Sequence, residues 1–225
     1  MAPEIIDSYS ESNFSTGTSI ISLHPTTTGY PSAAGQSFTC INAAKITSAK
    51  FYLKKVGSPS GDMHAVLYTH DGTYGTSSLP TGEPLSTSDD VAISGLTTEY
   101  QLITFAFSGA QQYEMSAATS YCITWENCTS GTMDDNNHPY IGEDRTSPTH
   151  GGNHMWWYSS AWAYINGWDC IFYVYGETAA TGTNTQINIG DSWKDIDAVK
   201  VNVGDSWKAV ASVKVNVGDS WKEIF

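Results

Sequence analysis

The feature that most restricts this fold is a repeat at the carboxyl end of the chain. Three similar units follow one another there: INIGDSWKDIDAVK (187–200), VNVGDSWKAVASVK (201–214) and VNVGDSWKEIF (215–225). Each unit joins an alternating Val or Ile run to a Trp-Lys run through Gly-Asp, which is typical of a tight β-hairpin turn. The tryptophans are 14 residues apart, and an even spacing keeps them on one side of a β-sheet.

The register of each predicted hairpin depends on the length of its loop. With a three-residue loop, Gly204-Asp205-Ser206, Val203 would lie opposite Trp207 and share a face with Val201. A two-residue loop would shift that pairing.

A meander of short strands cannot bury its own apolar face, and such small sheets are marginally stable in water. The face must pack on the rest of the chain or on the tails of other subunits, and the small, polar segment before the repeats favours other subunits. Three tails closing into a β-prism would also protect the edge strands, so we expect a homotrimer. The residues expected at this interface are Trp193, Trp207, Trp221, Val201, Val203, Val215 and Val217.

The rest of the chain has the pattern of many short strands. From 35 to 176, short apolar or β-branched runs alternate with turn clusters, and charged residues make up only 15% of the chain. We therefore predict an all-β fold, a jelly-roll β-sandwich followed by a β-hairpin or meander repeat. The predicted strands are 36–41, 49–56, 64–69, 100–107, 120–126, 155–158 and 169–176. Period-two alternation predicts that the core includes Phe51, Leu53, Ile103, Phe105 and Phe107.

Composition shifts divide the chain into four regions. These are an amino-terminal arm or edge strand (1–18), the jelly-roll sandwich (19–176), a small and polar linker (177–186) and the three Trp-containing repeats (187–225). Within the sandwich, the segments 57–62 and 71–82 are rich in turn-forming residues and are predicted to be loops.

The charge of the chain restricts its partners. Asp and Glu total 23 against 10 Lys and Arg, a net charge of −13, whereas nucleic-acid affinity comes mainly from clustered Lys and Arg. We therefore expect no nucleic acid partner, and no apolar run is long enough to predict membrane insertion. The first residues, MAPEIIDSYSESNF, lack the basic and apolar regions of a signal peptide. An extracellular type of composition without an export signal leads us to expect a virion-surface protein released by lysis.

Cysteine spacing and catalytic motifs give no sign of an active site. Cys40, Cys122, Cys128 and Cys170 lack the C-x-x-C spacing of a zinc site. They allow three disulfide pairings, with buried free thiols as the alternative. The chain has no G-x-S-x-G, H-E-x-x-H or P-loop motif and no evident carboxylate pair for glycoside hydrolysis. We therefore predict a protein that is not an enzyme and has no cofactor.

The most unusual segment is aromatic: HGGNHMWWY (150–158), followed by Trp162, Tyr164 and Trp168. Sugars have apolar C–H faces ringed by hydroxyls, so a sugar site needs aromatic platforms next to hydrogen-bonding groups. Because Trp156 and Trp157 are adjacent, a strand would turn one to the core and the other outward. The predicted glycan site consists of Trp157, Tyr158, Trp162, Asn153 and His154, and packing in the core or a subunit interface is the alternative.

One acidic segment is a weaker metal candidate. Asp134 and Asp135, with Glu143 and Asp144 further along a predicted loop, offer the oxygen ligands that calcium prefers. The spacing differs from that of an EF-hand, so a solvated acidic loop is the preferred interpretation and no metal is predicted. His150 and His154 are also dismissed as a zinc pair, because the Gly-Gly-Asn between them disfavours the helix that this spacing needs.

Several strings resemble known families. GQSFT (35–39), ITSAKFYLKK (46–55), the segments 67–68, 72–75 and 80–82, and DCIFYVYG (169–176) resemble a jelly-roll domain of environmental phage and bacterial surface proteins. That domain has the general layout of a carbohydrate-binding module, and the resemblance spans 30–176. The tail is similar to V-x-V-x-G-x-W-K repeats of phage structural proteins. Together these resemblances imply a fibre, spike or decoration protein whose partners are other virion proteins and a cell-surface glycan.

Two alternatives to this leading hypothesis stay open. One is a purely structural or fibril-forming subunit that binds its neighbours and no sugar. The other is a secreted carbohydrate-binding module.

Overall fold

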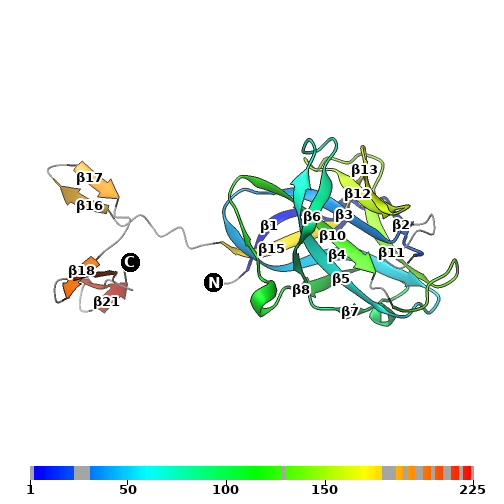
Figure 1. Ribbon diagram of the computed structural model, residues 1–225, viewed down its shortest axis with the longest axis horizontal. Coiled ribbons are helices and arrows are strands. Elements are labelled where there is room, and N and C mark those ends of the chain that lie inside the picture. Colours follow the sequence, from blue (N-terminus) through cyan, green and yellow to red (C-terminus); the bar gives the residue numbers. More distant parts are fainter. Residues whose placement is uncertain are drawn as a thin grey trace. The chain divides into compact units, whose positions relative to one another are not determined.

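The computed structural model describes residues 3–22, 31–127 and 130–178, together with the backbone of six short strands in the repeats (Figure 1). Contacts divide the chain into two compact units, Met1–Thr178 and Ala179–Phe225. No helix in the described part of the chain is long and apolar enough to span a membrane.

The first unit is a sandwich of two antiparallel β-sheets, which confirms the predicted all-β fold. Its described helices are three single turns of 3₁₀ helix, η1 (Glu11–Asn13), η2 (Ile93–Gly95) and η3 (Gly109–Gln111). Its strands are β1 (Glu4–Tyr9), β2 (Thr16–Ser19), β3 (Ala33–Cys40), β4 (Ala44–Val56), β5 (Asp62–Asp71), β6 (Leu79–Thr87), β7 (Val91–Ala92), β8 (Gln101–Ala106), β9 (Glu114–Met115), β10 (Thr119–Asn127), β11 (His138–Asp144), β12 (His154–Tyr158), β13 (Ala161–Ile165), β14 (Asp169–Cys170) and β15 (Phe172–Thr178).

The two sheets are built from strands distant in the sequence. The eight-stranded sheet has the order β1-β15-β4-β11-β14, with β2 paired to β11 and with β8 and β9 paired to β4. The seven-stranded sheet has the order β13-β12-β3-β10-β5-β6, with β7 paired to β5. The amino-terminal segment forms an edge strand, because β1 runs antiparallel to β15 with Glu4 opposite Gly176 (Figure 1).

The core lies between the inner faces of the two sheets. Trp125, Phe38 and Phe172 are fully buried there. The predicted alternation is confirmed: Phe51, Leu53, Phe105 and Phe107 are buried, and half-buried Ile103 packs against them. Full burial of a large apolar side chain contributes roughly 1.5–3 kcal/mol each.

Two segments predicted as loops contain strands. Residues 79–82 belong to β6, although Pro80 and Gly82 suggested a loop, because an edge strand tolerates proline on its unpaired side. Glu143 and Asp144 lie in β11, a strand paired on both sides, so the predicted acidic loop does not reach them. The strand predicted at 169–176 is divided into β14 and β15.

The described strands of the second unit form three two-stranded hairpins, as predicted. They pair β16 (Gln186–Ile189) with β17 (Ser192–Asp195), β18 (Lys200–Val203) with β19 (Ser206–Ala209), and β20 (Lys214–Val217) with β21 (Ser220–Glu223). Val203 pairs with Ser206, and Asn202 pairs with Trp207. This is the register of a two-residue loop, so the three-residue alternative, with Val203 opposite Trp207, is wrong.

Part of the predicted organisation lies outside the described residues. Glu177 and Thr178 end β15 and Gln186 begins β16, whereas the rest of the predicted linker is not described. The side chains of the predicted interface, at 193, 201, 203, 207, 215, 217 and 221, also lie outside the described part.

Candidate functional site

The aromatic residues singled out in the sequence lie on a hairpin at the edge of the seven-stranded sheet. β12 and β13 pair with Trp157 opposite Trp162. Their turn consists of Ser159 and Ser160, whose φ angles are 51° and 68°. Positive φ at both central residues is the requirement of a type I′ turn, whose twist matches that of the flanking strands. The turn therefore fixes the register that places the aromatic side chains.

Alternation along the hairpin separates these side chains into two faces. The first face, as we name it, carries Trp157, Trp162 and Tyr164, and the second face carries Trp156 and Tyr158. Trp156 and Trp157 point in opposite directions as predicted, but both are half-buried, so neither belongs to the main core. Tyr158 is not on the face of Trp157 and Trp162, so the structure does not bring the predicted trio together.

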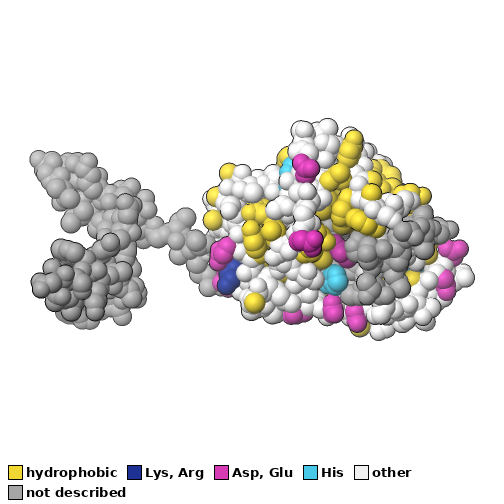
Figure 2. Space-filling view, in the orientation of Figure 1, with side chains coloured by type: hydrophobic (Ala, Val, Ile, Leu, Met, Phe, Trp, Pro, Cys, Tyr) yellow, Lys and Arg dark blue, Asp and Glu magenta, His cyan; other side chains and the backbone are white. Residues whose placement is uncertain are grey.

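The first face continues across the sheet. The rings of Trp157 and Trp162 meet edge to face at 5.6 Å, and Trp162 lies 6.2 Å from Tyr68 of β5. Beneath these rings, buried side chains of β5, β10 and β12 form a second, smaller core with Leu79. The edge strands β6 and β13 contact each other, so the sheet curls over this cluster. Figure 2 shows hydrophobic side chains gathered over the region of β12 and β13, and Tyr164 is 47% exposed.

A buried carboxylate accompanies these rings. Glu126 of β10 is 3% exposed, and its Oε1 accepts hydrogen bonds from Tyr68 Oη (3.0 Å) and Thr124 Oγ1 (2.8 Å). Burial, followed by the charge of Glu126, raises the pKa of Tyr68, which therefore stays a donor. Glu126 lies across from Ala33, which in turn lies across from Trp157. Aromatic surface and hydrogen-bonding groups thus occupy one row of the sheet.

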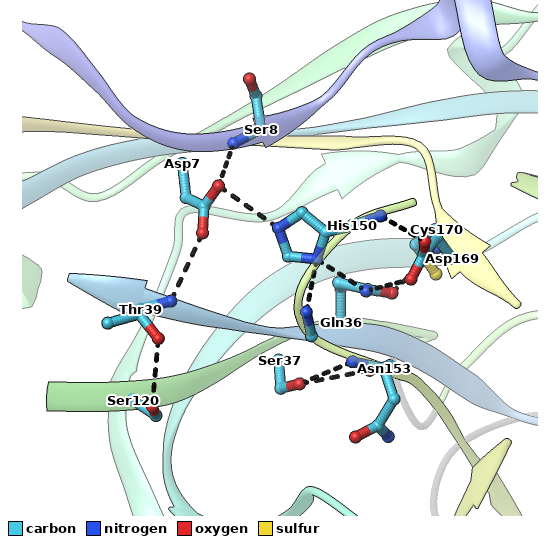
Figure 3. A network of polar contacts seen from close by, with 11 residues as sticks. Asp7, Ser8, Gln36, Ser37, Thr39, Ser120, His150, Asn153, Asp169 and Cys170 are labelled. Carbon is cyan, nitrogen blue, oxygen red and sulfur yellow. Dashed lines mark hydrogen bonds and ion pairs between the residues drawn. The ribbon is translucent and has the colours of Figure 1, made fainter. Parts of the chain in front are cut away.

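Asn153, a predicted ligand residue, is buried, and its side chain is hydrogen-bonded within the protein. Its side chain accepts a hydrogen bond from Ser78 N (3.0 Å) and donates to Ser78 O (3.3 Å). Its backbone N–H donates to Ser37 Oγ at 2.9 Å (Figure 3). Asn153 therefore holds the segment before β12 against β3 and the segment before β6.

His154, the other predicted polar ligand residue, is fully buried between the sheets. Its Nδ1 lies 2.9 Å from Cys170 Sγ and its Nε2 lies 3.4 Å from Glu143 Oε1. Burial lowers the pKa of His154 despite the nearby Glu143 carboxylate. The structure places His154 in the sandwich interior, where it supports the hairpin from below.

A polar network fixes the segment that leads into β12. His150 Nδ1 accepts a hydrogen bond from Gly152 N (3.0 Å), so the proton is on Nε2, 3.3 Å from Asp7 Oδ1. Asp169 accepts from His150 N (2.9 Å) and from Gln36 Nε2 (2.7 Å), and its burial raises its pKa. Figure 3 shows how these contacts join β1, β3 and β14 around His150. The hairpin therefore rests on a rigid base.

The remaining sequence candidates are not part of this site. Asp134 accepts hydrogen bonds from Asn136 N (2.8 Å) and Asn137 Nδ2 (3.0 Å), which lower its pKa, and Asp135 beside it is exposed. The described residues contain no group of three His, Cys, Asp or Glu arranged to hold a metal.

The cysteines of the described residues are free. Cys40, Cys122 and Cys170 are buried thiols, which matches the free-thiol alternative, and Cys128 lies outside the described residues.

Comparisons of the chain with protein-family models, curated proteins and solved structures give no match.

Sequence reasoning missed Tyr68 and Glu126. Their approach to Trp162 and Trp157 depends on the pairing of five strands. Alternation along β5 and β10 could have assigned Tyr68 and Glu126 to one face of the sheet. It could not have shown that this face lies beside the hairpin.

Proposed function

We propose that this chain is a non-enzymatic glycan-binding protein of a phage particle surface, and that the first face receives a cell-surface glycan. The observation that carries this proposal is the grouping of Trp157, Trp162 and Tyr164 in the same part of one sheet as Glu126 and Tyr68. The rings offer a stacking surface for the C–H face of a sugar. Glu126 and Tyr68, which are buried and hydrogen-bonded to each other, would hold this part of the sheet in place.

The proposal includes assembly of three chains through the repeats. Each described repeat hairpin is two-stranded, and an isolated two-stranded hairpin is marginally stable in water. Pairing between tails, and contacts with other virion proteins, would supply the missing neighbours. Three sandwiches on one particle component would then raise a weak sugar affinity by avidity.

A glycan array tests recognition with the full chain. We expect saturable signals that weaken about tenfold in Trp162→Ala and Tyr164→Ala, because each removes one stacking ring. Ile41→Ala is the control, since this apolar side chain is 71% exposed and belongs to neither face of the hairpin. Silence of the wild-type chain across a broad array would instead favour the purely structural, fibril-forming alternative.

Light scattering tests assembly. The full chain is expected to have three times the mass of one chain, and a variant that ends at Thr178 is expected to be a monomer. That variant keeps the sandwich and its whole described core. A monomer mass for both proteins would contradict the trimer.

A further inference from the structure

The second face of the hairpin continues into a row of three aromatic rings. Tyr158 and Trp156 are two residues apart on β12, with ring centroids 6.1 Å apart and planes inclined by 31°. Trp168, just before β14, meets Trp156 at 5.7 Å and 88°. Tyr158 is 43% exposed, and both tryptophans are half-buried. The row therefore runs from the hairpin strand to the segment before β14.

A guanidinium group lies at the end of this row. Arg145 stacks on Trp168, with 3.7 Å between its Cζ and the ring centroid. Its Nε and Nη2 lie 2.9 and 2.8 Å from Glu143 Oε2, and Nη2 also donates to Thr18 Oγ1. Within the described residues, Nη1 donates to no acceptor, and the Arg145 side chain is 30% exposed. Among the described residues, Nη1 thus keeps its donors without a protein acceptor, on a partly exposed guanidinium that stacks on Trp168.

The charge of this guanidinium is balanced within the fold. Glu143 is fully buried and neutralises Arg145 at short range. The chain as a whole carries a net charge of −13, so an anionic ligand would meet repulsion without gaining an unpaired cation. The chemistry favours a neutral acceptor, such as an amide carbonyl, over a carboxylate.

The rings are held in place before any ligand arrives. Buried His154 lies 6.2 Å from the Trp156 ring and 6.0 Å from the Trp168 ring, which supports both from below. Arg145 is fixed by two charge-assisted contacts. A preorganised surface binds a ligand with less loss of side-chain freedom.

We propose that the second face is a separate binding site for an N-acetylated sugar. The sugar ring would stack on Trp156 and Tyr158, and its acetamido carbonyl would accept a hydrogen bond from Arg145 Nη1. The site lies on the opposite side of the hairpin from the first face and requires no ligand there.

Two uncharged trisaccharides with the same backbone test the site, with binding to the full chain measured by calorimetry and tryptophan fluorescence. Chitotriose carries acetamido groups and cellotriose carries hydroxyls in their place. We expect chitotriose to bind about tenfold more tightly, which corresponds to roughly one added hydrogen bond. A glucuronate trisaccharide is expected to bind more weakly than chitotriose.

Matched variants assign the binding to this face. Tyr158→Ala should weaken chitotriose binding about tenfold, and Ile41→Ala, at an exposed apolar side chain in neither face of the hairpin, should leave it unchanged. Arg145→Lys keeps a cation beside Glu143 but removes the planar donor group, so it should abolish the preference for chitotriose over cellotriose. If Arg145→Lys fails to fold, Tyr158→Ala, at an exposed position, still tests whether chitotriose binds at the second face.

Equal affinity for the two trisaccharides, or chitotriose binding that survives Tyr158→Ala, would overturn the proposal. The failure of the first face is distinguishable: array signals unaffected by Tyr164→Ala would contradict that site and leave this one standing.

Discussion

The hairpin β12–β13 and the repeat hairpins share a local design but differ in what continues them. In each, two residues connect the paired strands: Ser159 and Ser160 in the sandwich, and 204–205 between Val203 and Ser206 in the second repeat. β12 continues into the seven-stranded sheet through β3, whereas each described repeat strand pairs only with its hairpin partner. The difference teaches that a tight turn sets the register of a hairpin, while distant strands and burial supply its stability.

The largest expected difference between the two kinds of hairpin follows from a cavity in the sandwich core. Trp125 is the largest fully buried side chain among the described residues, and Trp125→Ala is expected to lower the free energy of unfolding of the sandwich by about 3–5 kcal/mol. Urea unfolding measures this change. Amide exchange should speed up in β12 but not in β18 and β19. Equal acceleration in both would break the comparison.

Acid should also act on the sandwich alone. Burial lowers the pKa of His154 below the value of about 6.5 for an unfolded histidine. Protonation of His154 is therefore less favourable in the folded state than in the unfolded state. The resulting stabilisation is complete above pH ~6.5. It is lost as the pH falls toward the folded pKa, by up to about 1.4 kcal/mol per pH unit. The pKa of His70 is lowered mainly by burial and adds to the loss in this window. The repeats contain no histidine.

Unfolding free energies measured between about pH 7 and pH 5 test this expectation. His154→Gln should flatten the slope, because its amide does not titrate. An unchanged slope in the variant would contradict the assignment to His154.

A smaller effect, a rise in the free energy of unfolding, is expected at the turn of β12–β13. Ser160 has a φ of 68°, a conformation that costs a side-chain-bearing residue roughly 1–2 kcal/mol and glycine almost nothing. Ser160→Gly should therefore raise the free energy of unfolding by about 1 kcal/mol, measured in urea. Ser58→Gly, at an exposed serine without positive φ, should lower it slightly. A lower free energy of unfolding in Ser160→Gly would contradict the turn geometry.

The smallest effect concerns the register of the repeats. Asn202 pairs with Trp207, and Asn202→Thr should stabilise that cross-strand pair by about 0.2–1 kcal/mol. Slower amide exchange in β18 and β19 of the full chain would show the gain. Val203→Thr, at the position paired with Ser206, is the control and should give no such gain. The reverse result would restore the three-residue loop.

The local parts of the fold could be predicted from the sequence. Alternation identified Phe51 and Leu53 as core residues, and the repeated Gly-Asp identified the hairpins. β6 was missed because Pro80 reads as a strand breaker unless the strand is known to lie at an edge. β11 was missed because Glu143 and Asp144 look like loop residues, whereas Arg145, Thr18 and Tyr9 compensate their burial.

The candidate site could be predicted only as a segment. The sequence identified the aromatic run, but adjacent positions on a strand diverge, so Trp157 and Tyr158 lie on different faces. Asn153 and His154 looked like ligand groups because their partners, Ser78 and Glu143, are far away in the sequence. Burial that depends on such distant contacts leaves no trace in local composition.

The position of β15 has a mechanical consequence. This strand is the last of the sandwich before the repeats, and it is hydrogen-bonded along both sides, to β1 and to β4. Tension that enters at Thr178 therefore acts on an interior strand and must rupture two ladders together. β1 thus covers one edge of β15, the last strand of the sandwich, and both ladders resist a force applied at Thr178.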